Sequence, residues 1–181
     1  NTSRVAHLVT LIPRVAYEAA SQAEPGGGFA PQHGTAYDMR RELLLSPFGI
    51  PCNPPPWGVL SAVDMSTGKI VWESTLGTTE DIAPLGLALK LGTPNFGGPL
   101  ITAGGLVFIG ATMDDYLRAF SLRTGAEIWK GRLPAGGQAT PMSYVSEGRQ
   151  YVVIAAGGHG MSGTRRGDYV IAFALPLPDV N

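Results

Sequence analysis

Short apolar runs alternate with polar turn residues along most of the chain. From about residue 99 onward, glycine pairs, an Asp-rich tetrad and a Thr-Gly dipeptide separate these runs. Such residues accept the backbone conformations that tight hairpins require. The pattern predicts four strands, at 99–103, 106–110, 116–122 and 126–132. Four antiparallel strands within so short a stretch are typical of one β-propeller blade.

Two further groups of strands flank this blade. Downstream, the pattern predicts three strands, at 140–144, 151–156 and 169–175, with a nine-residue loop at 159–167. Upstream, it predicts the two outer strands of an earlier blade, at 59–64 and 69–74. The inner strands of that blade are expected within residues 1–20, with 7–12 as the best candidate. Between these elements we expect a Gly- and Pro-rich loop at 23–34 and a short helix at 39–45.

The expected organisation therefore has four parts. They are an irregular N-terminal segment with inner strands and a long loop (1–58), outer strands with a linker (59–92), a complete blade (93–135), and a three-stranded last blade with a C-terminal tail (136–181). The fold class is all-β, a partial β-propeller of about two and a half four-stranded blades.

One phrase occurs twice and supports this interpretation. Residues 62–72 and 119–129 share Ala, Thr, Gly and Trp at the same offsets, 57 positions apart. A phrase that repeats at this spacing indicates an array of similar units that bury their faces on each other. We expect Trp72 and Trp129 to dock between blades, each burying roughly 150–250 Å². Propellers close with about four to eight blades, so we expect a longer natural protein, with most blades before Asn1.

The amino-acid composition excludes several classes of function. The 181 residues include 13 basic and 14 acidic side chains, a balance that argues against a nucleic-acid surface or a polybasic membrane patch. No run approaches the roughly 20 apolar residues that span a bilayer. Cys52 is the only cysteine, which excludes an intrachain disulfide, and we expect it to be a buried filler or an inert thiol. A phosphate loop and a Gly-x-Ser-x-Gly motif are absent, and no Gly-x-Gly-x-x-Gly lies between a strand and a helix, which disfavours a nicotinamide enzyme.

Several motifs resemble those of one enzyme family. The repeated Trp phrase resembles the tryptophan-docking repeat of quinoprotein dehydrogenases, although non-enzymatic propellers share it. The stretch 92–175 is more specific. Its motifs are Gly92-Thr-Pro-Asn-Phe-Gly-Gly98, Thr112-Met-Asp-Asp-Tyr-Leu-Arg-Ala-Phe120, Leu133-Pro-Ala-Gly-Gly-Gln-Ala-Thr-Pro-Met142 and Ala156-Gly-Gly-His-Gly160. Together they resemble the C-terminal part of the membrane-bound glucose/quinate/shikimate dehydrogenases that depend on pyrroloquinoline quinone (PQQ).

The resemblance implies an eight-bladed propeller on the periplasmic face of a bacterial inner membrane. It implies oxidation of a sugar or cyclic polyol, hydride transfer to PQQ, and electrons passed to ubiquinone through an N-terminal anchor outside this chain. Ca²⁺ or Mg²⁺ is expected in the intact enzyme. The general base and the metal ligands are expected upstream, so we expect no catalytic or metal-binding residue here, and an inactive fragment. Alternatives are a non-enzymatic Trp-docking propeller scaffold for protein assembly and a soluble methanol-type quinoprotein.

Four residues are candidates for cofactor binding. His159 lies among glycines that let backbone approach a ligand, and the resemblance places it beside the quinone; a solvated turn residue is the alternative. Asp114 is expected near the cofactor or as a cap of its own turn. Asn95 and Phe96 are expected either in a tight entry turn or, by the resemblance, with backbone against the quinone.

Charged residues also lie close in sequence to two of these candidates, Asp114 and His159. Asp115 is expected to be a plain turn residue. The adjacent Arg165 and Arg166 are expected to face solvent, with the grip of an acidic substrate as the alternative.

Overall fold

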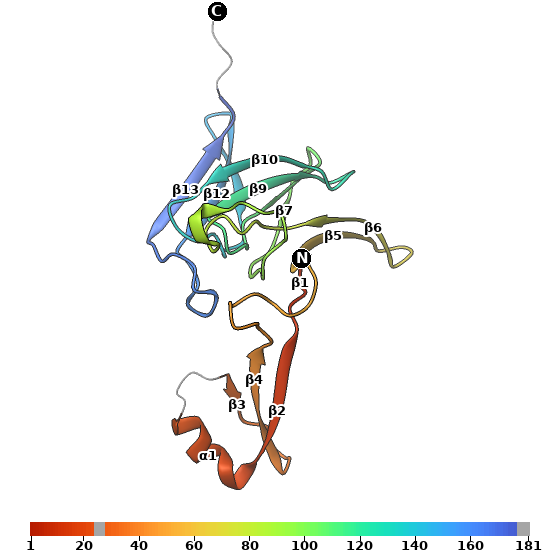
Figure 1. Cartoon of the computed structure of the whole chain (residues 1–181). Helices are drawn as coiled ribbons and strands as arrows, with labels where there is room; N and C mark the ends of the chain where they lie inside the picture. Colours follow the sequence, from red (N-terminus) through yellow and green to blue (C-terminus); the bar gives the residue numbers. More distant parts are fainter. Residues whose placement is uncertain (24–27, 177–181) are drawn as a thin grey trace, which may run out of the picture. The chain divides into compact units, whose positions relative to one another are not determined.

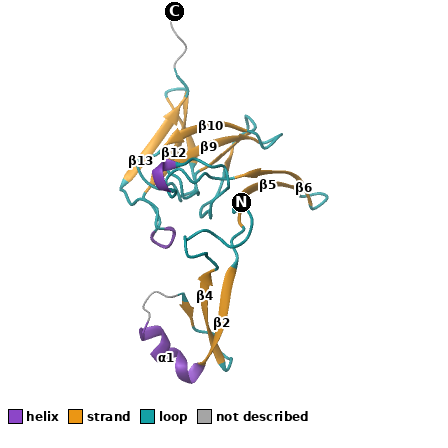
Figure 2. Cartoon of the chain, in the orientation of Figure 1, coloured by secondary structure: helices purple, strands orange, loops and turns teal. Residues whose placement is uncertain are grey.

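The computed structural model describes residues 1–23 and 28–176, and most of its regular secondary structure consists of antiparallel strands (Figure 2). Residues 24–27 of the expected loop and the expected tail at 177–181 lie outside the described residues. The chain divides into two compact units: one holds Asn1–Arg4 together with the chain from Pro55 onward, and the other is Val5–Pro54. Among the described residues, no helix has the length and apolarity needed to cross a bilayer.

The predicted complete blade is present in the first unit (Figure 1). Its four strands are β7 (Leu100–Ile101), β8 (Leu106–Ile109), β9 (Tyr116–Ser121) and β10 (Glu127–Arg132). They pair in the order β10-β9-β8-β7, each antiparallel to its neighbour in sequence. All four predicted strands are therefore confirmed, with the predicted hairpin order.

The three-stranded group downstream is also confirmed. It consists of β11 (Met142–Ser146), β12 (Arg149–Ala156) and β13 (Tyr169–Ala174), in that spatial order. The loop between β12 and β13 contains a short 3₁₀ turn, η2 (Gly160–Ser162).

The earlier blade differs from expectation in its inner strand. The predicted outer strands are confirmed as β5 (Gly58–Asp64) and β6 (Lys69–Thr75). Their inner partner is β1 (Thr2–Ser3), with Thr2 opposite Val59. The prediction that 7–12 supplies this strand is wrong, because that segment pairs within the other unit. A 3₁₀ turn, η1 (Pro84–Gly86), lies in the connection to β7.

The hydrophobic core lies between neighbouring sheets rather than within any one of them. Leu60 and Leu76 of the first sheet pack with Val107, Ile109 and Phe120 of the second. A second cluster joins the second sheet to the third, and its buried members are Leu117, Leu133, Ala135, Val152, Ile154 and Ala156. Each sheet therefore needs its neighbour to bury its apolar face, as expected for stacked repeats.

Trp72 docks on the next blade as the repeat predicts. Its indole N–H donates a hydrogen bond to the Leu122 carbonyl at 2.8 Å. A Cβ placed on Gly125 would lie 2.5 Å from the ring, so the Thr-Gly turn of the next blade supports the indole directly. Trp129 packs edge-on against Phe173, with centroids 5.1 Å apart, and is 39% exposed.

The second unit is a small sheet with one helix. Its elements are β2 (His7–Pro13), α1 (Arg14–Ala23), β3 (Phe29–Ala30) and β4 (Tyr37–Leu43), and the strands pair in the order β2-β4-β3. The short helix predicted at 39–45 is wrong, because that stretch is the central strand and pairs on both sides. The helix α1 was not predicted. Cys52 is exposed, so the expectation of a buried filler is wrong.

Candidate functional site

The four candidate residues all lie on segments that connect strands of the first unit. Asn95 and Phe96 precede β7, Asp114 lies in the turn between β8 and β9, and His159 lies in the β12–β13 loop. The structure brings two of them together. The rings of Phe96 and His159 stack with centroids 5.1 Å apart and an interplanar angle of 8°. Because Phe96 is 41% exposed, part of this aromatic pair is open to a ligand.

The backbone around His159 is held tightly. The His159 N–H donates to Thr164 Oγ1 at 2.9 Å, and the imidazole Nδ1 lies 3.2 Å from Ser162 Oγ. Gly158 has φ +72°, and a Cβ there would lie 2.3 Å from the Arg165 carbonyl oxygen, so only glycine fits. Among the described residues, His159 Nε2 has no hydrogen-bond partner.

Asn95 is engaged with protein rather than open to a ligand. The residue is buried, and its amide Nδ2 donates to the carbonyls of Thr2 and Thr93. Its backbone N–H donates to Ser3 Oγ at 2.9 Å. Asn95 thus fastens β1 to the segment that carries Phe96.

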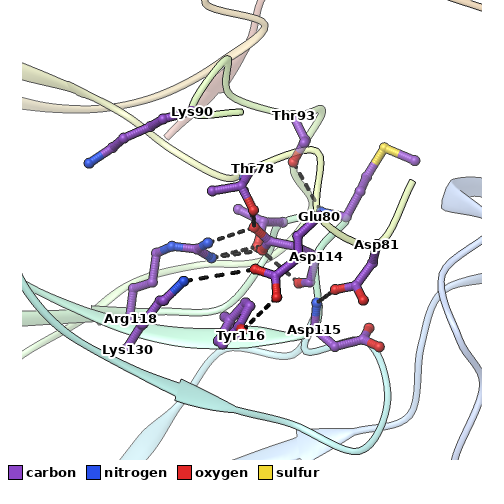
Figure 3. Close-up of polar contacts among 12 residues, drawn as sticks. Thr78, Glu80, Asp81, Lys90, Thr93, Asp114, Asp115, Tyr116, Arg118 and Lys130 are labelled. Atoms are coloured by element: carbon purple, nitrogen blue, oxygen red, sulfur yellow. Dashed lines mark hydrogen bonds and ion pairs between the residues drawn. The ribbon is translucent and has the colours of Figure 1, made fainter. Parts of the chain in front are cut away.

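Asp114 forms a fully buried ion pair with Arg118 (Figure 3). Arg118 donates from Nη1 to Asp114 Oδ1 at 2.8 Å and from Nη2 to Oδ2 at 2.6 Å. Thr112 Oγ1 donates to Oδ1, and the N–H and Oγ1 of Thr78 donate to Oδ2. The two side chains are 0% and 1% exposed. Asp114 therefore ties the β8–β9 turn to the segment after β6, and it does not touch His159 directly.

The electrostatics of this pair favour the charged form. Burial by itself raises the pKa of the Asp114 carboxyl, but hydrogen bonds from Arg118 and its charge, with help from Thr112 and Thr78, outweigh it. The pKa is therefore lowered, and Asp114 is ionised at neutral pH.

A second acidic group lies beside the first and was missed as a group by sequence reasoning. Asp115 is only 2% exposed, so the expectation of a plain turn residue is wrong. Its backbone N–H donates to Asp81 Oδ2 at 2.9 Å, and Arg132 forms a two-pronged pair with Asp81. Arg165 Nε lies 3.6 Å from Asp115 Oδ2, although the Arg165 side chain is 61% exposed. A cavity of about 100 Å³ adjoins these residues.

Asp115 and Asp81 respond to their surroundings in opposite ways. Burial, followed by the neighbouring charge of Asp81, raises the pKa of Asp115, against the opposing charges of Arg165 and Arg132. Burial also raises the pKa of Asp81, but the hydrogen bond from Arg132 outweighs it and the net direction is down. The only sequence signal for this cluster was the Asp114-Asp115 doublet after a buried strand, because its other members come from distant segments.

The arrangement suits a planar ligand with oxygen substituents. It offers a partly exposed aromatic pair, an imidazole nitrogen and close-approaching glycine backbone, with arginines nearby. Among the described residues, no group of three or more His, Cys, Asp or Glu side chains is arranged to hold a metal ion.

Comparison with known proteins identifies similar sequences. The family model described as "PQQ: Glucose/ethanol/alcohol dehydrogenase, beta-propeller domain" matches residues 1–152. The chain is 50% identical to the quinoprotein glucose dehydrogenase of Escherichia coli over 82% of its length. It is 51% identical over 88% of its length to a probable quinate dehydrogenase (quinone) of Xanthomonas campestris. These matches cover 19% and 21% of the two relatives, so the chain spans about a fifth of their length.

A solved structure agrees with the architecture. The quinohemoprotein alcohol dehydrogenase of Comamonas testosteroni aligns with 98% of this chain and 25% of its own, at 26% identity and a TM-score of 0.54.

Proposed function

Because this chain belongs to the PQQ glucose/ethanol/alcohol dehydrogenase β-propeller family, we propose that it forms the C-terminal part of a quinoprotein dehydrogenase that oxidises a sugar or cyclic polyol. The observation that carries this proposal is the 50% and 51% identity to a glucose and a quinate dehydrogenase over more than four fifths of the chain. The same identities favour the dehydrogenase over the assembly scaffold.

Incomplete docking supports the proposal that the chain is part of a longer propeller. The Thr124-Gly125 turn carries the ring of Trp72, whereas no described atom lies within 4 Å of a Cβ placed on Gly68, in the equivalent turn of the first blade. Trp129, the counterpart of Trp72, is 39% exposed. In this proposal, neighbouring blades of the longer protein cover both surfaces.

The aromatic pair of Phe96 and His159 is the part of this chain that we assign to the cofactor. When bound, PQQ would accept a hydride, with its electron pair, from the alcohol carbon. A planar conjugated quinone fits the open, parallel rings of the pair, and its carboxylates fit the exposed guanidinium of Arg165. With Nδ1 next to Ser162, the role of His159 is to offer Nε2 to an oxygen of the cofactor or substrate.

Asn95 and Asp114 have supporting roles in this proposal. Asn95 positions the Phe96 segment through its bonds to β1, and Asp114 fixes the turn beside the site through Arg118. The general base and the ligands of Ca²⁺ or Mg²⁺ belong to other blades of the intact enzyme. We place that enzyme on the periplasmic face of the bacterial inner membrane, with electrons passed to ubiquinone through a separate N-terminal anchor.

The test is dye-linked turnover by the full-length protein that carries this sequence. After addition of PQQ with Ca²⁺ or Mg²⁺, we expect oxidation of glucose, quinate or a related polyol, and loss of that activity when PQQ is withheld. Absence of turnover with sugars, cyclic polyols and simple alcohols alike, in protein that is folded, would refute the proposal. Reduction of added ubiquinone by the membrane-bound protein tests the electron path separately.

A further inference from the structure

A continuous line of hydrogen bonds connects the buried Asp114–Arg118 pair with the His159 loop. We propose that its two middle side chains, Gln138 and Thr164, are positioning residues that hold His159 against Phe96. This inference rests on the function proposed above, in which the aromatic pair faces the cofactor. Neither residue was a candidate in the sequence analysis, where Gln138 was only one member of the 133–142 motif and Thr164 only one residue of the 159–167 loop.

Each link in the line joins named atoms. Arg118 Nη1 donates to Thr112 Oγ1 at 3.1 Å, and the Thr112 carbonyl accepts from Gln138 Nε2 at 2.7 Å. Gln138 Oε1 accepts from Thr164 Oγ1 at 3.1 Å, and Thr164 Oγ1 accepts from the His159 N–H at 2.9 Å. Thr112 and Thr164 are buried, so water does not readily replace these bonds.

The chemistry of the two middle residues fixes the direction of every bond. A glutamine amide donates only from its nitrogen and accepts only at its oxygen. Since Gln138 Nε2 is committed to a carbonyl, Oε1 must face Thr164. The Thr164 hydroxyl has one proton, which it gives to Gln138, and its lone pairs remain for the His159 N–H. An apolar side chain of the same shape at either position breaks two links.

The two side chains lie so close to the backbone of Gly136 that this position has no room for a side chain of its own. A Cβ on Gly136 would lie 2.5 Å from Gln138 Oε1 and 2.7 Å from Thr164 Oγ1. Gly136 also binds both ends of the His159 loop, donating to the Arg165 carbonyl at 3.0 Å and accepting from the Gly158 N–H at 2.9 Å.

The Gln138 backbone also lies against Gly97, which follows the other residue of the aromatic pair. A Cβ on Gly97, the residue after Phe96, would lie 2.3 Å from the Gln138 carbonyl oxygen. The side chain of Gln138 therefore places His159 through Thr164, while its backbone packs against the segment that carries Phe96. Gln138 is therefore linked to both segments that carry the rings.

The experiment compares Thr164→Val with Thr164→Ser in the full-length protein. Two quantities are measured: hydrogen exchange of the 157–167 segment by mass spectrometry, and the affinity for PQQ in the presence of Ca²⁺. Loss of the hydroxyl removes both of its hydrogen bonds and should speed exchange at the His159 amide and weaken PQQ binding, each by about fivefold to tenfold. The serine variant keeps the hydroxyl and should restore both to within about twofold of wild type.

Thr102→Val is the matched control. The Thr102 hydroxyl also makes one donated and one accepted bond, both to the backbone of Leu106 in the β7–β8 hairpin. Its loss should leave both measurements unchanged. Wild-type exchange and PQQ affinity in Thr164→Val, or equal defects in the valine and serine variants, would overturn this inference alone. Failure of the wild-type protein to bind PQQ would overturn the proposed function and, with it, the role assigned here.

Discussion

At the residue scale, the adjacent Asp114 and Asp115 have opposite electrostatic environments. Asp114 faces a guanidinium and several donors, and its pKa is lowered. The Asp115 carboxyl is buried and lies near a second carboxylate, that of Asp81, and its pKa is raised. The two residues are identical in the sequence, and only their partners from distant segments give their carboxyls different pKa shifts. We therefore expect substitutions of the two residues to change the stability of the protein in different ways.

Asp114→Asn should strongly destabilise the protein. The substitution removes the buried carboxylate that pairs with Arg118 and leaves only Glu127, 3.7 Å from Nε, as an acidic partner among the residues that the structure describes, which costs on the order of 3–5 kcal/mol. The midpoint of urea denaturation, followed by tryptophan fluorescence at pH 7, measures this. Asp115→Asn is the matched control, because it changes the neighbouring residue in the same chemical way, and it should lower the midpoint far less. Equal losses in the two variants would contradict the account.

Asp115→Asn should also change how stability depends on pH. A carboxyl whose pKa is raised on folding binds its proton more tightly in the folded state, so ionisation costs stability. That cost appears as pH rises from the ordinary value of 3.8 through the raised pKa, and it persists at neutral pH. The stability of the variant relative to wild type should therefore improve between pH 4 and pH 7. A difference that is independent of pH over this range would refute the assigned environment.

At the element scale, the Thr-Gly turns differ in what they support. Gly125 has φ +71° and lies under the ring of Trp72, whereas Gly68 has φ +68° with no described atom nearby. Both turns need the left-handed backbone that glycine adopts most easily. The turn at Gly125 carries an indole from a neighbouring blade, and the turn at Gly68 carries none among the described residues.

Gly125→Ala should therefore cost more stability than Gly68→Ala. Each substitution adds backbone strain of about 1 kcal/mol. Only Gly125→Ala also drives a methyl group to within 2.5 Å of the Trp72 ring, which must shift and weaken its 2.8 Å bond to Leu122. The Trp emission spectrum and the melting temperature of the two variants provide the comparison. The account would be wrong if the two variants had the same melting temperature and emission.

Some of the helices and strands could be predicted from the sequence and others could not. The strands from residue 100 onward follow alternation and turn chemistry, and all of them were predicted. The stretch Tyr37–Leu43 contains Met, Arg, Glu and Leu, which favour helix by propensity, but pairing with strands on both sides overrode that preference. Arg14–Ala23 is rich in alanine and free of Gly and Pro, a helix signal that was present and was not used. Pairing of β1 with β5 spans more than 50 residues and leaves no local signal.

For the candidate site, too, some features could be predicted from the sequence and others could not. His159 and Phe96 were predicted separately from motifs, and their stacking appears only in the folded chain. The links through Gln138 and Thr164 involve single polar side chains in loops, for which periodicity carries no information.

At the scale of the whole molecule, we propose that this chain supplies one wall of a site that other blades complete. The isolated 181-residue chain should therefore show no dehydrogenase activity with added PQQ and Ca²⁺, because the base and the metal ligands are proposed to lie elsewhere. Dye-linked turnover above the background of cofactor alone would contradict this. The full-length protein assayed alongside is the positive control.

In the proposed function the His159–Phe96 pair lines the PQQ site, and the decisive experiment is an equilibrium titration of the full-length protein with PQQ. The account predicts saturable binding by the wild type and binding weakened about tenfold or more in His159→Ala, with an unchanged melting temperature of the unliganded protein. Wild-type affinity in His159→Ala, or no saturable binding by the wild type, would contradict it.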